Sequence, residues 1–368
     1  MYFERPAEIE LIRQMARNDP PAKPSPYITP ADQPDAFIIK PASSWLQKAN
    51  KMPNAAKLFG SFWFEGELCI MFADTNAGKS ILAVQIGDSI SRGLPIGDFE
   101  MRAKPATVLY IDFELSDKQF ESRYHDGAYG NYTFNNNFLR GVYNPASPKA
   151  RKFATFQDYI NNELENALLN TKAKVLIIDN ITCLRYGVHA ITGALNLLRS
   201  LQSIKNSYGL SILVLAHTPK RNNTKPLTRN DLQGSKMLIN FCDSAFAIGE
   251  SQTVPGQRYL KQIKQRSTHE EYGAGNVCLC NIRKHYNFLQ FRFTGYGHEG
   301  AHLASHSEQY RKNNEARITE YHRQGLSIRQ IAAKLSISAS TVFRAIKVLE
   351  NKEEETGNKS SPLERVII

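Results

Sequence analysis

The stretch that decides the fold is Gly66–Ser80, GELCIMFADTNAGKS, in which an apolar segment runs into a loop that contains glycine. Leu68–Ala73 predicts a buried strand and Ser80–Ser91 predicts a helix, so the loop joins a strand to a helix. In this context the backbone N–H groups of the loop turn inward and can cradle phosphate oxygens, and the positive end of the helix adds to the attraction. The stretch therefore predicts a phosphate-binding loop.

Each part of this loop has a predicted contact with a nucleoside triphosphate. Gly78 permits a close approach of the backbone, Lys79 reaches the β- and γ-phosphates, and the Ser80 hydroxyl is a ligand for Mg²⁺. Ala73 stands where such loops usually have their first glycine, and alanine is small enough for the turn. ATP and Mg²⁺ are the implied ligands. The predicted nucleotide-binding residues are Ala73, Asp74, Thr75, Asn76, Ala77, Gly78, Lys79, Ser80 and Ile81.

Apolar strands and amphipathic helices alternate along the chain as far as about residue 237. Short, nearly all-apolar strands that alternate with helices indicate a parallel sheet with helices on both faces, so the predicted fold class is α/β. After residue 237, short strands separated by turns predict a hairpin-rich end to this sheet. The strands beyond the first are expected at 107–113, 174–179, 211–216, 244–249, 258–264, 276–283 and 288–294.

Two carboxylates at strand ends are candidates for the chemistry. The strand at 174–179, KVLIID, ends in Asp179, which a parallel sheet places beside the phosphate loop, where it can hold Mg²⁺ through water. The strand at 107–113 runs directly into Glu114, which can orient and deprotonate an attacking water. Asp112 is the competing choice because strand alternation puts it on the same side, and we favour Glu114 because it lies further out.

Five motifs, in this order and spacing, resemble those of the RecA-like ATPases, and in particular the RepA-like and DnaB-like hexameric helicases. The resemblance covers about residues 45–295 and rests on GELCIMFADTNAGKS, YIDFELSDKQFESRY, KVLIIDNIT, ILVLAHTPKRN and IKQR. It implies a RecA-like sheet, with Glu114 at the position of the catalytic glutamate and Asp179 at that of the metal-site aspartate. It also implies that His217 senses the γ-phosphate; the alternative is a strand-end histidine with a structural hydrogen bond.

Lys264 and Arg266 match the K-x-R that this family has at the end of a late strand. The resemblance implies that both side chains reach the nucleotide of a neighbouring subunit and stabilise its transition-state charge. The alternative is a pair of solvated cations on an edge strand. A contact of this kind needs several copies of the chain, and the family implies a hexamer.

The chain carries 46 Lys and Arg residues against 35 Asp and Glu, and this formal net charge of +11 points to a polyanionic partner. Part of the surplus lies at 219–236, PKRNNTKPLTRNDLQGSK, directly after His217. In the family it resembles, the matching loop lines a central channel and grips single-stranded DNA by its backbone. A merely solvated loop is the alternative. The cations of this basic segment are Lys220, Arg221, Lys225, Arg229 and Lys236.

Residues 311–350 predict a separate, small, all-α unit. Helices expected at 315–323, 328–335 and 339–349, with a turn at 336–338, have the spacing of a helix-turn-helix. Polar residues on the last helix can contact a groove of duplex DNA and its phosphates, although a helical interaction module is the alternative. These residues are Ser340, Thr341, Arg344 and Lys347.

The predicted organisation is an N-terminal segment with a proline-rich linker (1–44), a RecA-like ATPase domain (45–296), a polar connector (297–310), the helix-turn-helix domain (311–350) and a mobile tail (351–368). No apolar run approaches the roughly 18 residues of a membrane helix, and the N-terminus does not resemble a secretory signal, so we expect a cytoplasmic protein.

The preferred function is ATP-driven, hexameric DNA unwinding or translocation in the replication of a plasmid or other mobile element. One alternative is a DNA-binding regulator or recombination factor that uses ATP as an assembly switch. Another is a RecA-like ATPase that does not act on DNA, which the basic segments make less attractive.

Overall fold

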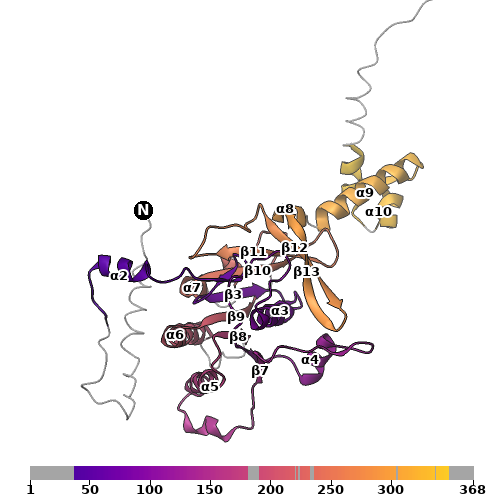
Figure 1. Cartoon of the computed structure of the whole chain (residues 1–368). Helices are drawn as coiled ribbons and strands as arrows, with labels where there is room; N and C mark the ends of the chain where they lie inside the picture. The colour runs from indigo at the N-terminus through magenta and orange to yellow at the C-terminus, as the bar shows by residue number, and fades with distance from the viewer. Residues whose placement is uncertain are drawn as a thin grey trace, which may run out of the picture. The chain divides into compact units, whose positions relative to one another are not determined.

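The computed structural model describes residues 37–180, 190–219, 221–222, 224–232, 236–303, 306–335 and 337–347, with the backbone alone at 190–195, 236–237 and 306–313. The chain divides into two units, of which the first ends at Asn54 and the second begins at Ala55 (Figure 1). The second unit begins at Ala55, whereas the predicted ATPase domain begins at residue 45. The reason is that the intervening helix α2 (Ala42–Ala49) buries none of its residues. No helix in the described ranges has both the length and the apolar character that crossing a membrane requires.

A nine-stranded sheet runs through the second unit in the order β13-β12-β11-β10-β3-β9-β8-β4-β7. The strands from β10 to β7 are parallel to their neighbours, whereas β11, β12 and β13 are antiparallel. The α/β class and the hairpin-rich end of the sheet are thus confirmed. The strands are β3 (Leu68–Ala73), β4 (Val108–Asp112), β7 (Phe138–Val142), β8 (Val175–Asp179), β9 (Ser211–His217), β10 (Ser244–Glu250), β11 (Gln257–Lys264), β12 (Val277–His285) and β13 (Phe288–Gly297).

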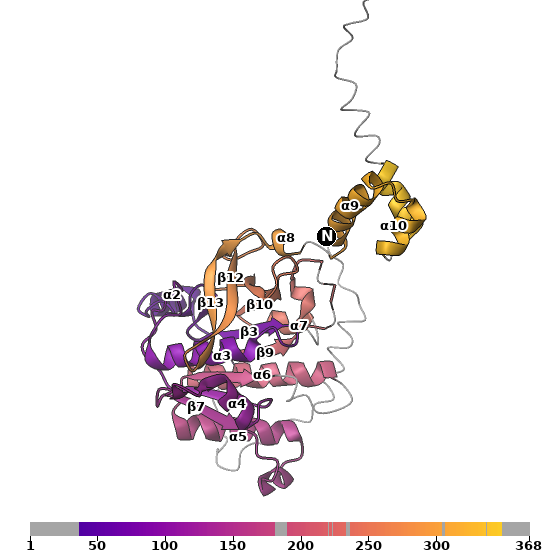
Figure 2. The same ribbon diagram turned by 90° about the vertical axis from the view of Figure 1, so that its right-hand side faces the viewer.

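Helices cover both faces of this sheet (Figures 1 and 2). Strand alternation divides the side chains of β3, so that Cys69 and Met71 pack in the cluster that includes helix α3, while Ile70 and Phe72 pack in the cluster that includes α5 and α6. The two hydrophobic clusters therefore lie on opposite faces. The helices of this part are α3 (Lys79–Arg92), α4 (Asp117–Tyr124), α5 (Phe156–Thr171), α6 (Ala190–Tyr208) and α7 (Lys236–Phe241).

Local sequence explains where the helices next to the site begin. Gly78 precedes α3 with a left-handed φ of 101°, and Gly93 ends the helix with a φ of 68°. Ser116 begins α4 with a capping box, because its hydroxyl accepts from the Gln119 N–H while the Gln119 side chain accepts from the Ser116 N–H. These two starts fix where the loops after β3 and β4 leave the sheet.

Strand β7 was not predicted from the sequence. Its five residues, FLRGV, include Arg140 and Gly141, and as an edge strand it is only partly buried, so it lacks a continuous apolar pattern. The smaller elements that the sequence also did not reveal are β1 (Lys57–Phe59), β2 (Trp63–Phe64), β5 (His125–Asp126), β6 (Gly130–Asn131), and the short 3₁₀ helices at Pro148–Lys152 and Arg229–Asp231.

The stretch 297–310, which we expected to be a polar connector, contains regular structure. This stretch contains helix α8 (Glu299–His302) and the start of α9 (His306–Arg323). Glu299 is buried because its carboxylate has internal partners. It accepts hydrogen bonds from the Lys261 ammonium, the Leu227 N–H and the Tyr259 hydroxyl. Glu299, although charged, is thus packed inside the folded unit.

Three helical segments near the C-terminus share a hydrophobic cluster of their own: α9, α10 (Ile328–Leu335) and residues 339–347. Ser327 begins α10 by accepting from the Gln330 N–H. The predicted helices at 328–335 and at the described part of 339–349 are therefore present, while their use as a DNA-binding helix-turn-helix stays a prediction. The buried members of the cluster are Ile318, Ile331, Ala332, Leu335, Val342 and Ile346.

A close approach between α3 and β7 yields a prediction about stability. A Cβ atom at Gly87 would lie 2.4 Å from the Phe138 ring and 3.2 Å from Ile177 Cδ1. We expect Gly87→Ala to lower the free energy of unfolding by about 1–2 kcal/mol, because overpacking outweighs the better helix propensity of alanine. Urea unfolding measures this. Gly127→Ala, where a Cβ meets nothing within 4 Å, is the control and should change stability by less than about 0.5 kcal/mol. Equal stability of the two variants would contradict the close approach.

Candidate nucleotide-binding site

The phosphate loop leaves the sheet at its centre. Ala73, the last residue of β3, is paired with Ile248 of β10 on one side and with His217 of β9 on the other. The loop then turns through Asn76 and Gly78, whose φ angles of 63° and 101° are left-handed. The predicted strand–loop–helix context of residues 73–81 is therefore present, with Lys79 as the first residue of α3.

Gly78 has a second reason to be glycine. A Cβ atom at this position would lie 2.5 Å from Ile282 Cδ1 and 2.9 Å from the Phe291 ring. The hairpin of β12 and β13 therefore packs directly against the start of the phosphate-loop helix, which leaves no room for a side chain.

Lys79 is buried, with 6% of its surface exposed, and its ammonium is bound inside the loop. Nζ donates to the carbonyls of Ala73 (3.0 Å) and Asp74 (2.9 Å), and it lies 3.1 Å from His217 Nδ1. Burial lowers the pKa of Lys79, against the pull of the nearby carboxylates. Three acceptors thus surround this cation where the predicted role places phosphate oxygens.

His217 connects this lysine to the candidate base. An ammonium can only donate, so Nδ1 of His217 accepts from Lys79 and the ring proton is assigned to Nε2. Nε2 lies 3.3 Å from Glu114 Oε1. The hydrogen bond from His217 lowers the pKa of Glu114, whose side chain is 35% exposed. Glu114 is therefore held in its charged form at neutral pH.

Asn180 is a site residue that the sequence analysis missed. It follows Asp179 directly, is buried, and donates from Nδ2 to Glu114 Oε1; the same nitrogen lies 3.0 Å from His217 Nε2. The signal available in the sequence was its place just past the end of β8, where polar side chains of a parallel sheet gather.

Asp179 has the surroundings of a metal ligand. The Tyr110 hydroxyl donates to Oδ2 at 2.7 Å, while Oδ1 is buried and accepts no hydrogen bond from any described residue. Burial raises the pKa of Asp179 to about 6, and the nearby hydroxyl groups of Ser80 and Tyr110 oppose this shift. A buried carboxylate oxygen without a partner, close to a hydroxyl, suits a hard cation that takes oxygen ligands. Asp179 and Ser80 therefore fit Mg²⁺.

Asp112 is the competing candidate for the general base, and both of its carboxylate oxygens accept hydrogen bonds at the turn after β4. Oδ1 accepts from the backbone N–H groups of Glu114 (3.0 Å) and Leu115 (2.9 Å), and Oδ2 accepts from Arg140 Nε at 3.0 Å. The residue is buried. Of the two carboxylates, Glu114 is the one whose side chain contacts His217 and Asn180.

Lys264 and Arg266 lie near the beginning of β3, at the opposite end of the strands from the phosphate loop. Lys264 Nζ donates to the carbonyls of Ile239 and Cys242, and Arg266 Nη1 lies 3.2 Å from Asp243 Oδ1. Asp243 in turn accepts from the N–H of Leu68, the first residue of β3. Because five residue steps separate Leu68 from Ala73, the two ends of β3 are about 17 Å apart. The structure does not bring these two cations to the site of their own chain.

The basic segment is only partly described. Arg221 is held within it, 3.4 Å from Asp231 and donating to the Lys225 carbonyl, whereas the Lys225 and Arg229 side chains are exposed. Lys220 lies outside the described residues, and Lys236 begins α7 with its side chain not described. The other residues predicted to contact DNA are exposed on the helical stretch 339–347, namely Ser340, Thr341, Arg344 and Lys347.

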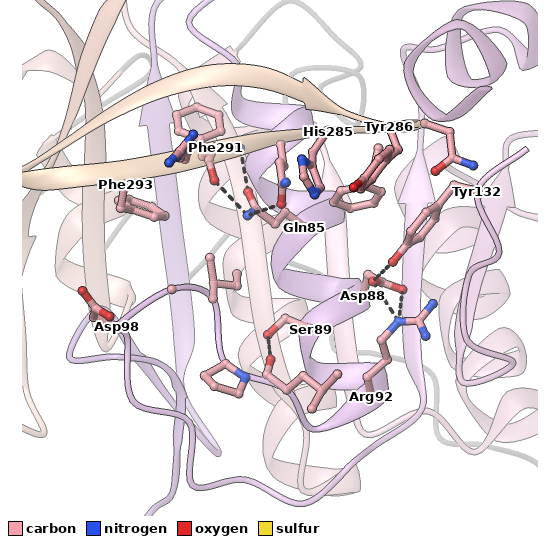
Figure 3. Close-up of a pocket in the computed structure, with 18 residues that line it drawn as sticks. Gln85, Asp88, Ser89, Arg92, Asp98, Tyr132, His285, Tyr286, Phe291 and Phe293 are labelled. Carbon is pink, nitrogen blue, oxygen red and sulfur yellow. Dashed lines mark hydrogen bonds and ion pairs between the residues drawn. The ribbon is translucent and has the colours of Figure 1, made fainter. Parts of the chain in front are cut away.

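A cavity of about 600 Å³ lies elsewhere, between α3, the loop at 94–98 and the hairpin of β12 and β13 (Figure 3). Gln85 binds both backbone groups of Phe291 there, and Asp88 binds Arg92 and Tyr132. None of residues 73–81 lines this cavity. It is therefore distinct from the phosphate loop.

Comparison with known proteins places the chain in a family. The family described as AAA domain matches residues 34–223, which include the phosphate loop, Glu114, Asp179 and His217. The chain belongs to the AAA domain family. Among solved structures, a KaiC-like protein from the hyperthermophilic archaeon Pyrococcus horikoshii is similar over 62% of this chain and 91% of that chain, with 13% identity and a TM-score of 0.42. No curated protein matches the chain. The family, together with the site, supports a nucleotide-hydrolysing ATPase.

The contacts of Glu114 yield a prediction about catalysis. We expect Glu114→Gln to lower kcat for ATP hydrolysis about 100-fold or more, because an amide cannot accept the proton of the attacking water. Nucleotide affinity should stay within about twofold, since the phosphate loop is untouched. Phosphate release and titration with a fluorescent nucleotide measure the two quantities. Glu121→Gln, on exposed α4, is the control and should hydrolyse ATP normally. Normal turnover by Glu114→Gln would contradict the assignment.

Proposed function

We propose that this protein is an ATP-driven DNA translocase or helicase of the RepA-like kind, acting in the replication of a plasmid or other mobile element. The observation that carries the proposal is the position of His217. Its ring contacts Lys79 on one side and Glu114 on the other, and the basic segment begins two residues later. A change at the phosphates is thus linked through one side chain to a segment rich in cations.

The proposed chemistry is in-line attack of water on the γ-phosphate. Lys79 leaves the carbonyls of Ala73 and Asp74 and binds the β- and γ-phosphates of ATP. Glu114 orients the water and takes its proton while the water oxygen bonds to phosphorus, and the bond to the β–γ bridging oxygen breaks to release ADP. Mg²⁺ held by Ser80 and Asp179 would neutralise charge on the phosphates. His217, whose Nε2 lies 3.3 Å from Glu114 Oε1, is the proposed sensor of the γ-phosphate.

Two groups of exposed residues support a nucleic-acid partner. Lys225 and Arg229 of the basic segment suit the backbone of single-stranded DNA, because flexible cations neutralise phosphates without reading sequence. Ser340, Thr341, Arg344 and Lys347 share one exposed helix, which suits the groove of a duplex. In the regulator alternative, this helix carries the main activity and ATP only switches assembly.

Strand displacement separates a motor from a switch. We expect the purified protein with ATP and Mg²⁺ to displace a labelled strand from a forked DNA substrate, and Lys79→Ala to show no displacement. Lys118→Ala, which removes a lysine that is 88% exposed on α4, is the matched control and should unwind normally. If the protein hydrolyses ATP but displaces no strand on any fork, and binds duplex DNA in an ATP-dependent way, the helicase hypothesis is contradicted and the regulator hypothesis is favoured.

The location of Arg266 supports an active site shared between subunits. Arg266 and Lys264 lie at the end of the strands that is opposite to the phosphate loop of their own chain. They can therefore act in hydrolysis only on the nucleotide of another copy. In a ring or filament each copy then lends these cations to the next, where they stabilise the charge of the leaving phosphoryl group.

Mixing inactive subunits tests this sharing. We expect Arg266→Ala and Glu114→Gln proteins, each impaired alone, to regain hydrolysis when mixed, because about a quarter of the interfaces in a random mixture combine an intact Glu114 with an intact Arg266. Phosphate release of the mixture against its separate components measures this. A mixture of Lys79→Ala with Glu114→Gln is the control, since both defects lie in one site and no interface is restored. Absence of rescue in the first mixture would refute the trans role.

A further inference from the structure

Arg140 lies on β7 beside the segment that carries Glu114, and its guanidinium is bound in three directions. Nε donates to Asp112 Oδ2 at 3.0 Å, Nη1 to Asp117 Oδ1 at 2.8 Å, and Nη2 to the Leu115 carbonyl at 2.8 Å. The guanidinium carbon also lies 4.5 Å from the centre of the Phe120 ring, and the side chain is 16% exposed. All of these partners fall within residues 112–120.

The partners of Arg140 control the backbone on both sides of Glu114. Asp112, held by Arg140, accepts the N–H groups of Glu114 and Leu115 with its other oxygen. Arg140 itself binds the carbonyl of Leu115. The turn between β4 and α4 is thus fixed at two N–H groups and one carbonyl, and a single guanidinium organises all three contacts.

We propose that Arg140 is the positioning residue of Glu114: through Asp112 and Leu115 it holds the turn in the conformation that directs the Glu114 carboxylate to His217 and Asn180. The proposal rests on ATP hydrolysis by Glu114 in the proposed function and is independent of DNA unwinding. Arg140 does not touch the reacting atoms, and no partner of its guanidinium is a residue of the phosphate loop.

The pairing of the strands explains how a residue 28 positions away can act here. β7 runs parallel to β4, with Arg140 opposite Tyr110. The long side chain of Arg140 therefore reaches forward to Asp112, the last residue of β4, and to the turn that follows it. Asp112 is buried, and a buried carboxylate needs a partner of opposite charge. Arg140 is that partner, and so the charge that stabilises Asp112 also shapes the turn.

Arg92 offers a matched control within the same unit (Figure 3). Like Arg140, it is ion-paired with a buried aspartate, Asp88, donates to a backbone carbonyl, that of Thr133, and lies over an aromatic ring, that of Tyr132. Asp88 lies nine positions after Lys79 on α3, Tyr132 and Thr133 lie outside this helix, and none of the three belongs to the segment of Glu114. A loss that reflects weakened folding alone should therefore appear equally in both arginines.

The test compares Arg140→Lys with Arg92→Lys. Lysine keeps the charge but cannot bind in three directions with a planar fork. We expect Arg140→Lys to lower kcat for ATP hydrolysis about 10- to 100-fold, as a misplaced catalytic group does. KM and the affinity for a fluorescent ADP should stay within about twofold, and Arg92→Lys should change none of the three beyond that. Unchanged kcat in Arg140→Lys, or an equal loss in Arg92→Lys, would overturn the proposal.

Epistasis shows whether the loss passes through Glu114. In a Glu114→Gln background, Arg140→Lys should cause no further loss of residual hydrolysis, because the group that it positions is already gone. A further loss of the same fold as in the wild-type background would show that Arg140 acts by another route.

Hydrogen exchange adds a readout that does not depend on activity. The amides of Glu114 and Leu115 are hydrogen-bonded to Asp112, so in Arg140→Lys they should exchange faster, while peptides of β3 and β9 keep wild-type rates. Wild-type exchange at these two amides would overturn the proposal. If the wild-type protein hydrolyses ATP without unwinding DNA, the motor is refuted and the role of Arg140 is unaffected.

Discussion

The register of the parallel strands is the constraint on which the candidate site depends. Ala73 of β3 lies opposite His217 of β9, and Asp112 of β4 lies opposite Asp179 of β8. Because the parallel strands all end on the same side of the sheet, the loop after β3 and the turn after β4 lie at that same end, with β9 and β8 between them. The chain thereby brings Lys79, Glu114 and His217 within hydrogen-bonding distance, although 138 positions separate the first from the last. A slip of one residue in any of these pairings would turn the polar ends away from each other.

The sequence predicted the parts of this arrangement that a continuous pattern encodes. β3 and α10 begin and end at the predicted residues, and the other parallel strands that were predicted, β4, β8, β9 and β10, differ by one residue at one or both ends, because buried strands and amphipathic helices leave a periodic signal. Arg140 and Asn180 left no such signal. Arg140 lies on a short edge strand, and its partner Asp112 is 28 positions away. Only the folded register shows that the two meet, and the same holds for buried Glu299, whose partners come from β11 and the basic segment.

Lys79 and Asp179, which are expected to bind the phosphates and the metal, differ in how far their hydrogen-bonding groups are already paired. The lysine half is complete without nucleotide, because Lys79 binds two loop carbonyls and His217. The aspartate half is not, because Oδ1 of buried Asp179 has no hydrogen-bond partner among the described residues. An unpaired buried oxygen destabilises the protein, so a cation at this point relieves a penalty, whereas phosphates must compete with existing bonds of Lys79. Binding of the metal therefore satisfies an unpaired oxygen of the folded site, whereas binding of the nucleotide must first break hydrogen bonds of Lys79.

The contacts of the basic segment set limits on how the site can act on it. The residue just before the segment is fixed to the phosphate loop, because the Thr218 N–H donates to the Ala73 carbonyl at 3.0 Å. The segment itself is tied at Leu227, whose N–H binds Glu299 and whose carbonyl binds Lys261. In the proposed mechanism, a displacement of His217 acts first on the stretch that ends at Leu227, although the ion pair between Arg221 and Asp231 extends beyond that limit. Glu299 and Lys261 are buried and paired, so they hold the far end of that stretch in place. A motion that begins at the phosphates must therefore displace Leu227 or the pair of Arg221 and Asp231 before it can reach the rest of the basic segment.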